Sequence, residues 1–266
     1  MPNAIDKVED TAQNVEDHPV AGWFAAAGHV ANGVVHIIIG LIAVGVGRGA
    51  GGSADQSGAM RALDSTPLGS VALWFVGLSL VGLGIYQLAE AIGHVRRDIK
   101  DAVRGFGRMV AYFAVAFIAL TYATGGTSDG EETTKSLSAT LLSSTWGTIL
   151  MAIVALGILA VGIYMIVKGI RRTFLKDAKV GARSRKWFTA LGVTGYVAKG
   201  LAVTAVGVLF AVAVWTSDGE QAGGLDSALK SFIDLPYGQP ILIAIGIGLI
   251  TYGIFCFARA RKVKPS

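Results

Sequence analysis

Six long apolar stretches set the strongest limit on how this chain can fold. They cover roughly residues 23–46, 69–92, 106–124, 146–169, 189–215 and 238–258. A helix that crosses a bilayer needs about 20 mainly apolar residues, and none of the stretches shows the alternating pattern of a barrel strand. Hydrophobic residues make up 53% of the chain and charged residues only 15%. The sequence therefore predicts an all-α polytopic membrane protein with six transmembrane helices.

Lysine and arginine residues in the connecting segments indicate how these helices are oriented, because short basic connections stay in the cytoplasm. Basic residues are concentrated in three segments, at 96–108, 168–186 and 259–264, whereas the opposite connections contain only Arg48, Arg61, Lys135 and Lys230. Both termini are therefore expected in the cytoplasm, in a multi-pass membrane protein. Residues 1–22 have neither a basic start nor an apolar core, so no cleavable signal peptide is expected.

Two separate motifs repeat along the chain at nearly the same period. Gly28, Gly107 and Gly195 each open a segment of six similar residues in an odd-numbered stretch, at offsets of 79 and 88. The even-numbered stretches share a tyrosine at offsets of 78 and 88, namely Tyr86, Tyr164 and Tyr252. Because two independent motifs give nearly one period, they indicate tandem repeats.

Each predicted repeat is a helical hairpin. The units are expected at residues 23–97, 98–175 and 176–262, with a polar acidic tail at 1–22 and a short C-terminal tail at 263–266. Two crossings return the chain to its starting side of the membrane. The three hairpins are therefore parallel, and we expect them to surround a pseudo-threefold axis normal to the membrane.

Short helices are expected in the connections on the external side. Ser128 with Glu131, and Ser217 with Glu220, have the S-x-x-E spacing of a capping box. Semi-apolar segments lie in all three external connections, at 60–68, 137–146 and 225–237. Their pattern predicts short helices that lie at the membrane interface.

The repeated motifs carry a family resemblance. Three hairpins, each opening with a Gly-aromatic-x-Ala-basic-Gly segment and closing on a Gly-x-Tyr segment, resemble the bacterial family catalogued as domain of unknown function 1206. The resemblance extends from about Trp23 to Lys262. Lys199 occupies the basic position in the third repeat, whereas Asn32 and Ala111 occupy it in the first two. The resemblance implies three tandem repeats in a bacterial plasma membrane and brings no established activity with it.

Five polar residues within the spans form the candidate functional site, namely His29, Asn32, His36, Glu90 and Lys199. A charge in the middle of a bilayer costs at least about 2.5 kcal/mol on insertion scales, so such residues commonly mark functional sites. In one interpretation they line a hydrated cavity that opens to the cytoplasm. In the other, Lys199 extends to the interface or pairs with Glu90, while the remaining residues bond between helices.

The three repeated tyrosines allow two interpretations as well. Tyr86, Tyr164 and Tyr252 are expected in the cytoplasmic halves of their spans. They either pack beside neighbouring glycines or form a threefold polar ring, and packing is the favoured interpretation.

No cofactor, metal site or catalytic centre is predicted. His29 and His36 are about 10.5 Å apart along one helix, so they cannot ligate one haem iron from opposite faces. A single cysteine, Cys256, and the lack of an HxxxH pair argue against zinc, and the Ser-Asp-Gly-Glu loops lack the ligand sequence of a calcium-binding EF-hand. No Walker motif or nucleophile elbow occurs either, so we expect no enzymatic activity.

Two functions remain open. The net charge of +5 comes from clusters beside the apolar stretches, which argues against nucleic acid and predicts contact between residues 176–186 and anionic lipid headgroups. The favoured function is a structural or accessory membrane component that stabilises a membrane-protein partner, because proline-broken helices and large external domains are not predicted. The alternative is a small transporter or channel-like protein with a cytoplasm-facing polar cavity for protons or an anionic ligand.

Overall fold

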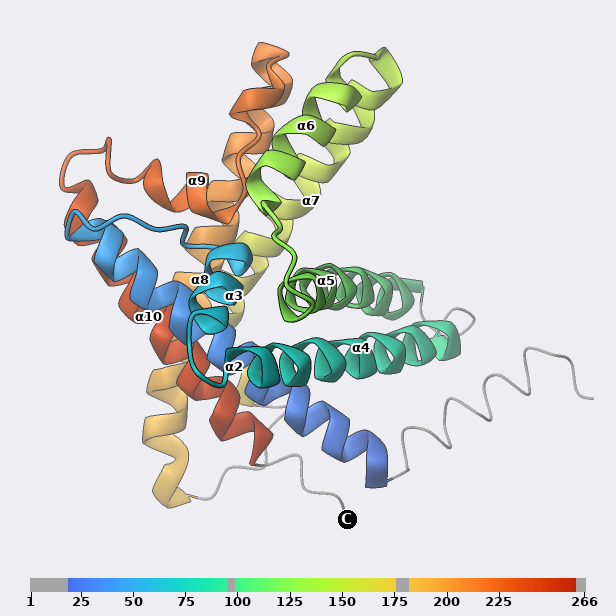
Figure 1. Ribbon diagram of the computed structural model, residues 1–266, viewed down its shortest axis with the longest axis vertical. Coiled ribbons are helices and arrows are strands. Elements are labelled where there is room, and N and C mark those ends of the chain that lie inside the picture. Colours follow the sequence, from blue (N-terminus) through green and yellow to red (C-terminus); the bar gives the residue numbers. More distant parts are fainter. Residues whose placement is uncertain (1–18, 95–98, 176–181, 262–266) are drawn as a thin grey trace, which may run out of the picture. The chain divides into compact units, whose positions relative to one another are not determined.

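The computed structural model describes residues 19–94, 99–175 and 182–261 (Figure 1). Six of its helices are long and apolar enough to cross a membrane. They are α2 Pro19–Gly47, α4 Gly69–His94, α5 Ile99–Ala123, α7 Thr145–Ile170, α8 Ala182–Thr216 and α10 Gly238–Ala260. No strand occurs in the three described ranges. The prediction of an all-α polytopic protein with six spans is confirmed.

Two of the long helices extend beyond their apolar stretches. α5 begins at Ile99 rather than near residue 106, and α8 begins at Ala182 rather than near residue 189. Arginine and lysine favour the helix, so hydropathy marks the part of a helix that crosses the membrane and misses the polar turns before it. Parts of all three predicted basic clusters, at 96–98, 176–181 and 262–264, lie outside the described residues, as do residues 1–18 of the N-terminal tail and the whole C-terminal tail.

Three shorter helices lie in the connections for which interfacial helices are predicted. α3 spans Gln56–Asp64, α6 spans Gly130–Leu142 and α9 spans Leu225–Lys230, and two 3-10 turns, η1 Thr173–Leu175 and η2 Gly219–Gln221, also occur. Each short helix overlaps its predicted segment, although α3 and α6 start earlier, and α3, α6 and α9 end earlier, than expected. The helices therefore form, and their position at a membrane surface stays a prediction.

The capping of these segments differs from the prediction by one residue. Asp129, not Ser128, is the N-cap of α6, and its carboxylate accepts two backbone N–H groups of the first turn at 3.0 and 3.1 Å. Asp218 caps η2 in the same manner, while Ser217 has a left-handed φ of 55°. A carboxylate accepts free N–H groups more strongly than a neutral hydroxyl does. The two predicted capping boxes are wrong, and the Glu131 side chain bonds elsewhere.

The described helices form two compact units. The first contains α4, α5 and the parts of α2 and α10 at residues 19–32 and 256–260. The second contains the rest of α2 and α10 together with α6, α7, α8, α9 and most of α3. α2 and α10 therefore contribute to both units.

In the first unit, α4 and α5 pack against each other as an antiparallel pair (teal and green in Figure 1). A Cβ atom at Gly77 would lie 2.6 Å from Cδ2 of Leu120, and one at Gly84 would lie 3.0 Å from the Phe113 ring. Helices in lipid gain little from the hydrophobic effect between them, so association depends on such close packing of large side chains against small residues. The glycines therefore hold this pair together by letting the axes approach.

In the second unit, α2 and α10 pack antiparallel through paired glycines (blue and red in Figure 1). Gly40 lies opposite Gly246, and a Cβ atom at Gly40 would lie 2.6 Å from the Gly246 carbonyl oxygen. Gly33 lies opposite Gly253, seven residues away along each helix. A seven-residue spacing returns to nearly the same helical face, so both glycine pairs belong to one continuous contact.

α7 and α8 form another antiparallel pair in the same unit. A Cβ atom at Gly200 would lie 2.8 Å from the Gly162 carbonyl oxygen, and α8 also packs on α10, where Ala198 lies against Gly248. Helices thus contact partners both within a repeat and in the next repeat. The arrangement of the three hairpins around a pseudo-threefold axis stays a prediction.

Candidate functional site

Two of the predicted candidate residues contact one aromatic ring in the second unit. The ammonium nitrogen Nζ of Lys199 in α8 lies 4.3 Å from the centre of the Tyr252 ring in α10. The His36 ring in α2 lies 4.8 Å from the same ring, centre to centre, and His36 is buried. A cation over a ring face is attracted by the negative face of the π-system, most strongly where water is excluded. Tyr252 therefore joins three helices and two polar residues.

A cluster of aromatic residues continues from this contact. Tyr196 meets Tyr252 edge-on at 5.5 Å, and Phe255 lies 5.7 Å from Tyr196, again edge-on. Phe174 and Phe188 extend the cluster, and Nζ of Lys168 lies 5.4 Å above the Tyr196 ring. Edge-to-face rings at these distances stabilise packing beyond the area that they bury. Lys199 therefore borders the aromatic cluster through its contact with Tyr252.

Glu90 has its partners in the first unit. Its carboxylate accepts a hydrogen bond of 2.7 Å from Nε2 of Gln87, and Nη2 of Arg108 lies 3.9 Å away. Asn32 belongs to the same unit and donates to Sγ of Cys256 at 3.6 Å. His29 also lies in this unit, on a half-buried part of α2. Glu90 and Asn32 are thus held within helix contacts of the first unit.

The three repeated tyrosines have different surroundings. Tyr252 is 8% exposed, whereas Tyr164 is 61% exposed and Tyr86 is half-buried. Tyr252 packs against the aromatic cluster, as the packing interpretation predicts. Equivalent positions in the sequence thus have unequal roles in the structure.

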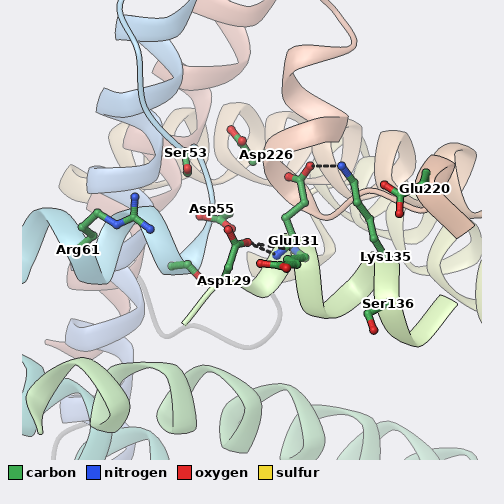
Figure 2. Close-up of a pocket in the computed structure, with 11 residues that line it drawn as sticks. Ser53, Asp55, Arg61, Asp129, Glu131, Lys135, Ser136, Glu220 and Asp226 are labelled. Atoms are coloured by element: carbon green, nitrogen blue, oxygen red, sulfur yellow. Dashed lines mark hydrogen bonds and ion pairs between the residues drawn. The ribbon is translucent and has the colours of Figure 1, made fainter. Parts of the chain in front are cut away.

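An open pocket of about 620 Å³ lies in the second unit where α3, α6, η2 and α9 meet (Figure 2). Six acidic, two basic and three serine residues line it, namely Ser53, Asp55, Ser57, Arg61, Asp129, Glu131, Glu132, Lys135, Ser136, Glu220 and Asp226. We call it the acidic pocket. The predicted candidate site includes none of these residues.

Hydrogen bonds around the acidic pocket connect segments from all three repeats. Oδ1 of Asp226, in α9 of the third repeat, accepts the backbone N–H of Ala54 in the first repeat at 2.7 Å. Oγ of Ser57, in α3 of the first repeat, accepts the backbone N–H of Gly130 at the start of α6 in the second repeat, at 3.2 Å. These two bonds join the first repeat to both of the others.

Glu131 closes the cycle by joining the second repeat to the third. Its carboxylate accepts the backbone N–H of Ser227 at 3.2 Å and also the Ser227 hydroxyl. Nζ of Lys135, one turn further along α6, lies 3.2 Å from the same carboxylate. The three repeats are therefore tied together in a ring of hydrogen bonds that includes two carboxylates.

The electrostatics of the pocket act in opposite directions on two of its carboxyl groups. Burial raises the pKa of Asp55, and the neighbouring carboxylates Asp226, Asp129 and Glu131 raise it further, against a hydrogen bond from the Gly58 N–H. For Glu131, burial also raises the pKa, but hydrogen bonds from Ser227 and Lys135 outweigh it and lower the pKa overall. The charged form of Glu131 is thus stabilised, whereas the charged form of Asp55 is destabilised.

Four of the six carboxylates of the acidic pocket accept hydrogen bonds from donors of the chain itself, namely Asp55, Asp129, Glu131 and Asp226. Lys230 forms an ion pair of 2.6 Å with Asp226, in addition to the Ala54 bond. Within the described part of the chain, no group of three or more His, Cys, Asp or Glu residues is arranged to hold a metal ion. The arrangement suits a latch, by which we mean a set of hydrogen bonds that fixes the connecting segments of the three repeats to one another. The repeated Ser-Asp-Gly-Glu motif signals this region in the sequence, but a motif alone does not identify its partners.

The comparison with known families bears directly on the three repeats. The sequence profile of the family described as Domain of Unknown Function (DUF1206) matches three times, at residues 27–94, 104–172 and 194–263. The chain belongs to the DUF1206 family. Each DUF1206 match covers one of the six long helices completely and most of another, so the predicted tandem repeats and the predicted family are confirmed.

One relative extends over nearly the whole DUF1206 protein. The uncharacterized protein YxxB of Bacillus subtilis (strain 168) is 28% identical over 253 residues, which is 92% of each chain. No solved structure matches the chain significantly. The family and this relative therefore support the three-repeat architecture and assign no activity to it.

Proposed function

We propose that this DUF1206 protein is a structural or accessory component of the bacterial plasma membrane that stabilises a membrane-protein partner and has no catalytic activity. The observation that carries the proposal is the engagement of polar span residues in helix contacts. Lys199 lies over Tyr252, and Glu90 bonds to Gln87 beside Arg108. Polar side chains occupied in this way join helices and do not present their charge to a substrate.

The acidic pocket supports the same proposal. Its carboxylates Glu131 and Asp226 accept hydrogen bonds that connect the repeats, and each also pairs with a lysine one turn away. A site built to bind a mobile cation would leave carboxylate oxygens for that cation. We therefore propose that the pocket fixes the positions of the loops on one side of the bundle.

We propose an orientation in which this latch faces the exterior and both termini lie in the cytoplasm. Cationic residues gather at the opposite end of the α7–α8 pair, among them Arg171, Arg172, Arg185 and Lys186. Connections rich in lysine and arginine are retained in the cytoplasm during insertion, whereas connections with few of these residues are translocated. The proposed partners are anionic lipids on the cytoplasmic side and a membrane protein, with no role for nucleic acid.

A flux measurement separates the accessory role from the transport alternative. The full-length protein is placed in liposomes that contain a pH-sensitive dye, and a proton gradient is applied. We expect the same decay of the gradient as in empty liposomes, because Lys199 and His36 are held against the Tyr252 ring. A faster decay that Lys199→Leu abolishes and Lys168→Leu preserves would overturn the proposal. Lys168 is a matched control because it also lies over a tyrosine ring, that of Tyr196.

Partner capture tests the accessory role directly. The tagged protein is cross-linked in native membranes and purified, and the recovered proteins are compared with those from a Lys199→Leu variant. We expect one membrane protein to be recovered in a fixed ratio with both forms, because the proposal gives Lys199 a role in helix contacts only. Recovery of the chain without a stoichiometric membrane partner would contradict the proposal.

A further inference from the structure

A second pocket lies at the other end of the α7–α8 pair, where α7 ends and α8 begins. It has a volume of about 900 Å³ and is lined by Arg172, Arg185, Lys186, Thr189, Ala190, Val193 and Thr194. We call it the basic pocket. Among its described lining residues three are cationic and none is acidic. Three guanidinium or ammonium groups around one hollow are suited to an anion with several oxygen atoms.

Arg172 occupies a backbone position that does not favour arginine. It follows the C-cap residue of α7 and has a φ of 56°, in the left-handed region, while its N–H bonds to the Gly169 carbonyl oxygen at 3.1 Å. Glycine is the usual residue at this position of a helix end, because it has no Cβ to clash. The structure thus accepts backbone strain at a place where the side chain is directed to the basic pocket.

The rest of the pocket follows one face of α8 from charged to apolar. Arg185 and Thr189 are one turn apart, and Val193 follows after another turn. Arg185 and Lys186 lie at the start of the candidate membrane span Ser184–Thr216, just before its apolar part. In a membrane-spanning helix this is the level of the phosphate groups, and the residues after it are at the level of the acyl chains.

An exposed tryptophan marks the same level. Trp187 follows Lys186 directly and is 77% exposed. Tryptophan is enriched where a span meets the headgroup region, because its ring is apolar and its N–H is polar. The charged end of the basic pocket is therefore placed at the boundary between headgroups and acyl chains.

We propose that the basic pocket binds the phosphate of an anionic glycerophospholipid from the cytoplasmic leaflet. The phosphate oxygens are bound by Arg172, Arg185 and Lys186, and the Thr189 hydroxyl lies beside them. The part of the acyl chain next to the headgroup packs along Ala190 and Val193. The sequence predicts only a general attraction between basic segments and anionic lipid, whereas this proposal specifies one site and the residues that bind the phosphate. The site rests on the proposed orientation in the membrane and is independent of the accessory role.

Native mass spectrometry of the full-length protein tests this site. The delipidated protein in detergent is titrated with phosphatidylglycerol, and in parallel with phosphatidylcholine of the same chain length. We expect tighter binding of phosphatidylglycerol, and a loss of about fivefold for each cation removed from the pocket. Arg185→Gln combined with Lys186→Gln is thus expected to weaken binding about 25-fold. Unchanged binding in this double variant would overturn the proposal.

Two single variants separate lipid binding from folding. Arg172→Gly removes a cation and relieves the left-handed backbone, so it is expected to keep or raise the melting temperature while it weakens phosphatidylglycerol binding about fivefold. Arg171→Gln removes the adjacent exposed cation, which does not line the pocket, and is expected to change binding less than twofold. Equal losses from both variants would show a diffuse charge effect and would contradict the site.

A further measurement distinguishes a lipid phosphate from a soluble phosphate as the ligand of the basic pocket. Glycerol 3-phosphate is added to the complex with phosphatidylglycerol at equal concentration. We expect the lipid to stay bound, because its acyl chains also contact the α8 face. Full displacement by glycerol 3-phosphate would assign the pocket to a soluble phosphate and would overturn the lipid proposal. Neither result alters the flux and partner-capture measurements, so the two proposals fail separately.

Discussion

The Asp226 carboxylate accepts the backbone N–H of Ala54 at 2.7 Å, although 172 positions of sequence separate the two residues. The same carboxylate pairs with Lys230 at 2.6 Å. Together with the Ser57–Gly130 and Glu131–Ser227 bonds, it completes a ring of contacts through the three repeats. A backbone N–H that is buried needs a partner, so each bond of the ring depends on the fold of another repeat.

Removal of the Asp226 side chain is expected to destabilise the protein. In Asp226→Ala, the N–H of Ala54 loses its acceptor and Lys230 loses its counter-ion, which costs about 1 to 3 kcal/mol of stability. The measurement is the midpoint of thermal unfolding of the purified protein in detergent. Glu132→Gln is the control, because Glu132 is an exposed residue that lines the same pocket. A similar midpoint for Asp226→Ala and Glu132→Gln would refute the latch.

Protonation of Asp55 is expected to stabilise the acidic pocket. Burial and three neighbouring carboxylates raise the pKa of Asp55 above that of the unfolded chain. A raised pKa means that the favourable contribution is fully present below the ordinary pKa of about 4 and is lost as pH rises through the folded value. Asp55→Asn mimics the protonated form and keeps an oxygen for the Gly58 N–H. The variant should therefore unfold at a higher temperature than the native protein at neutral pH.

The pH dependence of that gain is the decisive measurement. Unfolding midpoints of the native protein and Asp55→Asn are compared from about pH 4 to pH 8. We expect the advantage of the variant to shrink toward the acidic end, where the native Asp55 takes up its proton. The contribution of Glu131 to stability depends on pH in the opposite direction. Its lowered pKa gives stability that is present above the ordinary pKa and lost on acidification. A constant advantage at all pH values would contradict the account of Asp55.

Close approach of α2 and α10 is expected to depend on Gly40. The first atom of any side chain at this position would lie 2.6 Å from the Gly246 carbonyl oxygen, so Gly40→Val forces the helices apart. Overpacking of this kind typically costs about 1 to 3 kcal/mol. The matched control is Gly157→Val in α7, where an added Cβ meets no atom within 4 Å. Thermal unfolding in detergent should show a clear loss for the first variant and little change for the second.

The six spans could be predicted from the sequence because long apolar segments have one solvent in which they are stable. The starts of α5 and α8 could not, since the polar turns before the spans carry no hydropathy signal. The cap of α6 could not be predicted, because Ser128 and Asp129 are adjacent potential caps and only geometry decides between them. The acidic pocket depends on contacts such as Ala54 with Asp226, whose distance in sequence leaves no local pattern.

The candidate residues in the spans were partly accessible to sequence reasoning. Lys199 and His36 could be singled out because polar residues are rare in apolar helices. Their common contact with Tyr252 could not be predicted, because the three tyrosines repeat at almost one period and look equivalent. Only the packing of α8 and α2 against α10 distinguishes Tyr252 from the exposed Tyr164.

This difference between the tyrosines leads to a prediction with an internal control. Tyr252→Leu removes the ring that Lys199 and His36 contact, and with it a cation–π contact of about 2 kcal/mol in a water-poor setting. Tyr252→Phe keeps the ring and is expected to retain most of the stability. Tyr164→Leu alters the equivalent residue of the second repeat, which is 61% exposed, and should change the unfolding midpoint little.

Thermal unfolding of the three variants in one detergent gives the required ranking. We expect Tyr252→Leu to unfold well below the native protein, Tyr252→Phe close to it and Tyr164→Leu close to it. Combining Tyr252→Leu with Lys199→Leu should cost less than the sum of the single changes, because both remove the same contact. Additive losses would mean that Lys199 and Tyr252 act independently, and the aromatic ring would then no longer explain how a lysine is held within a span.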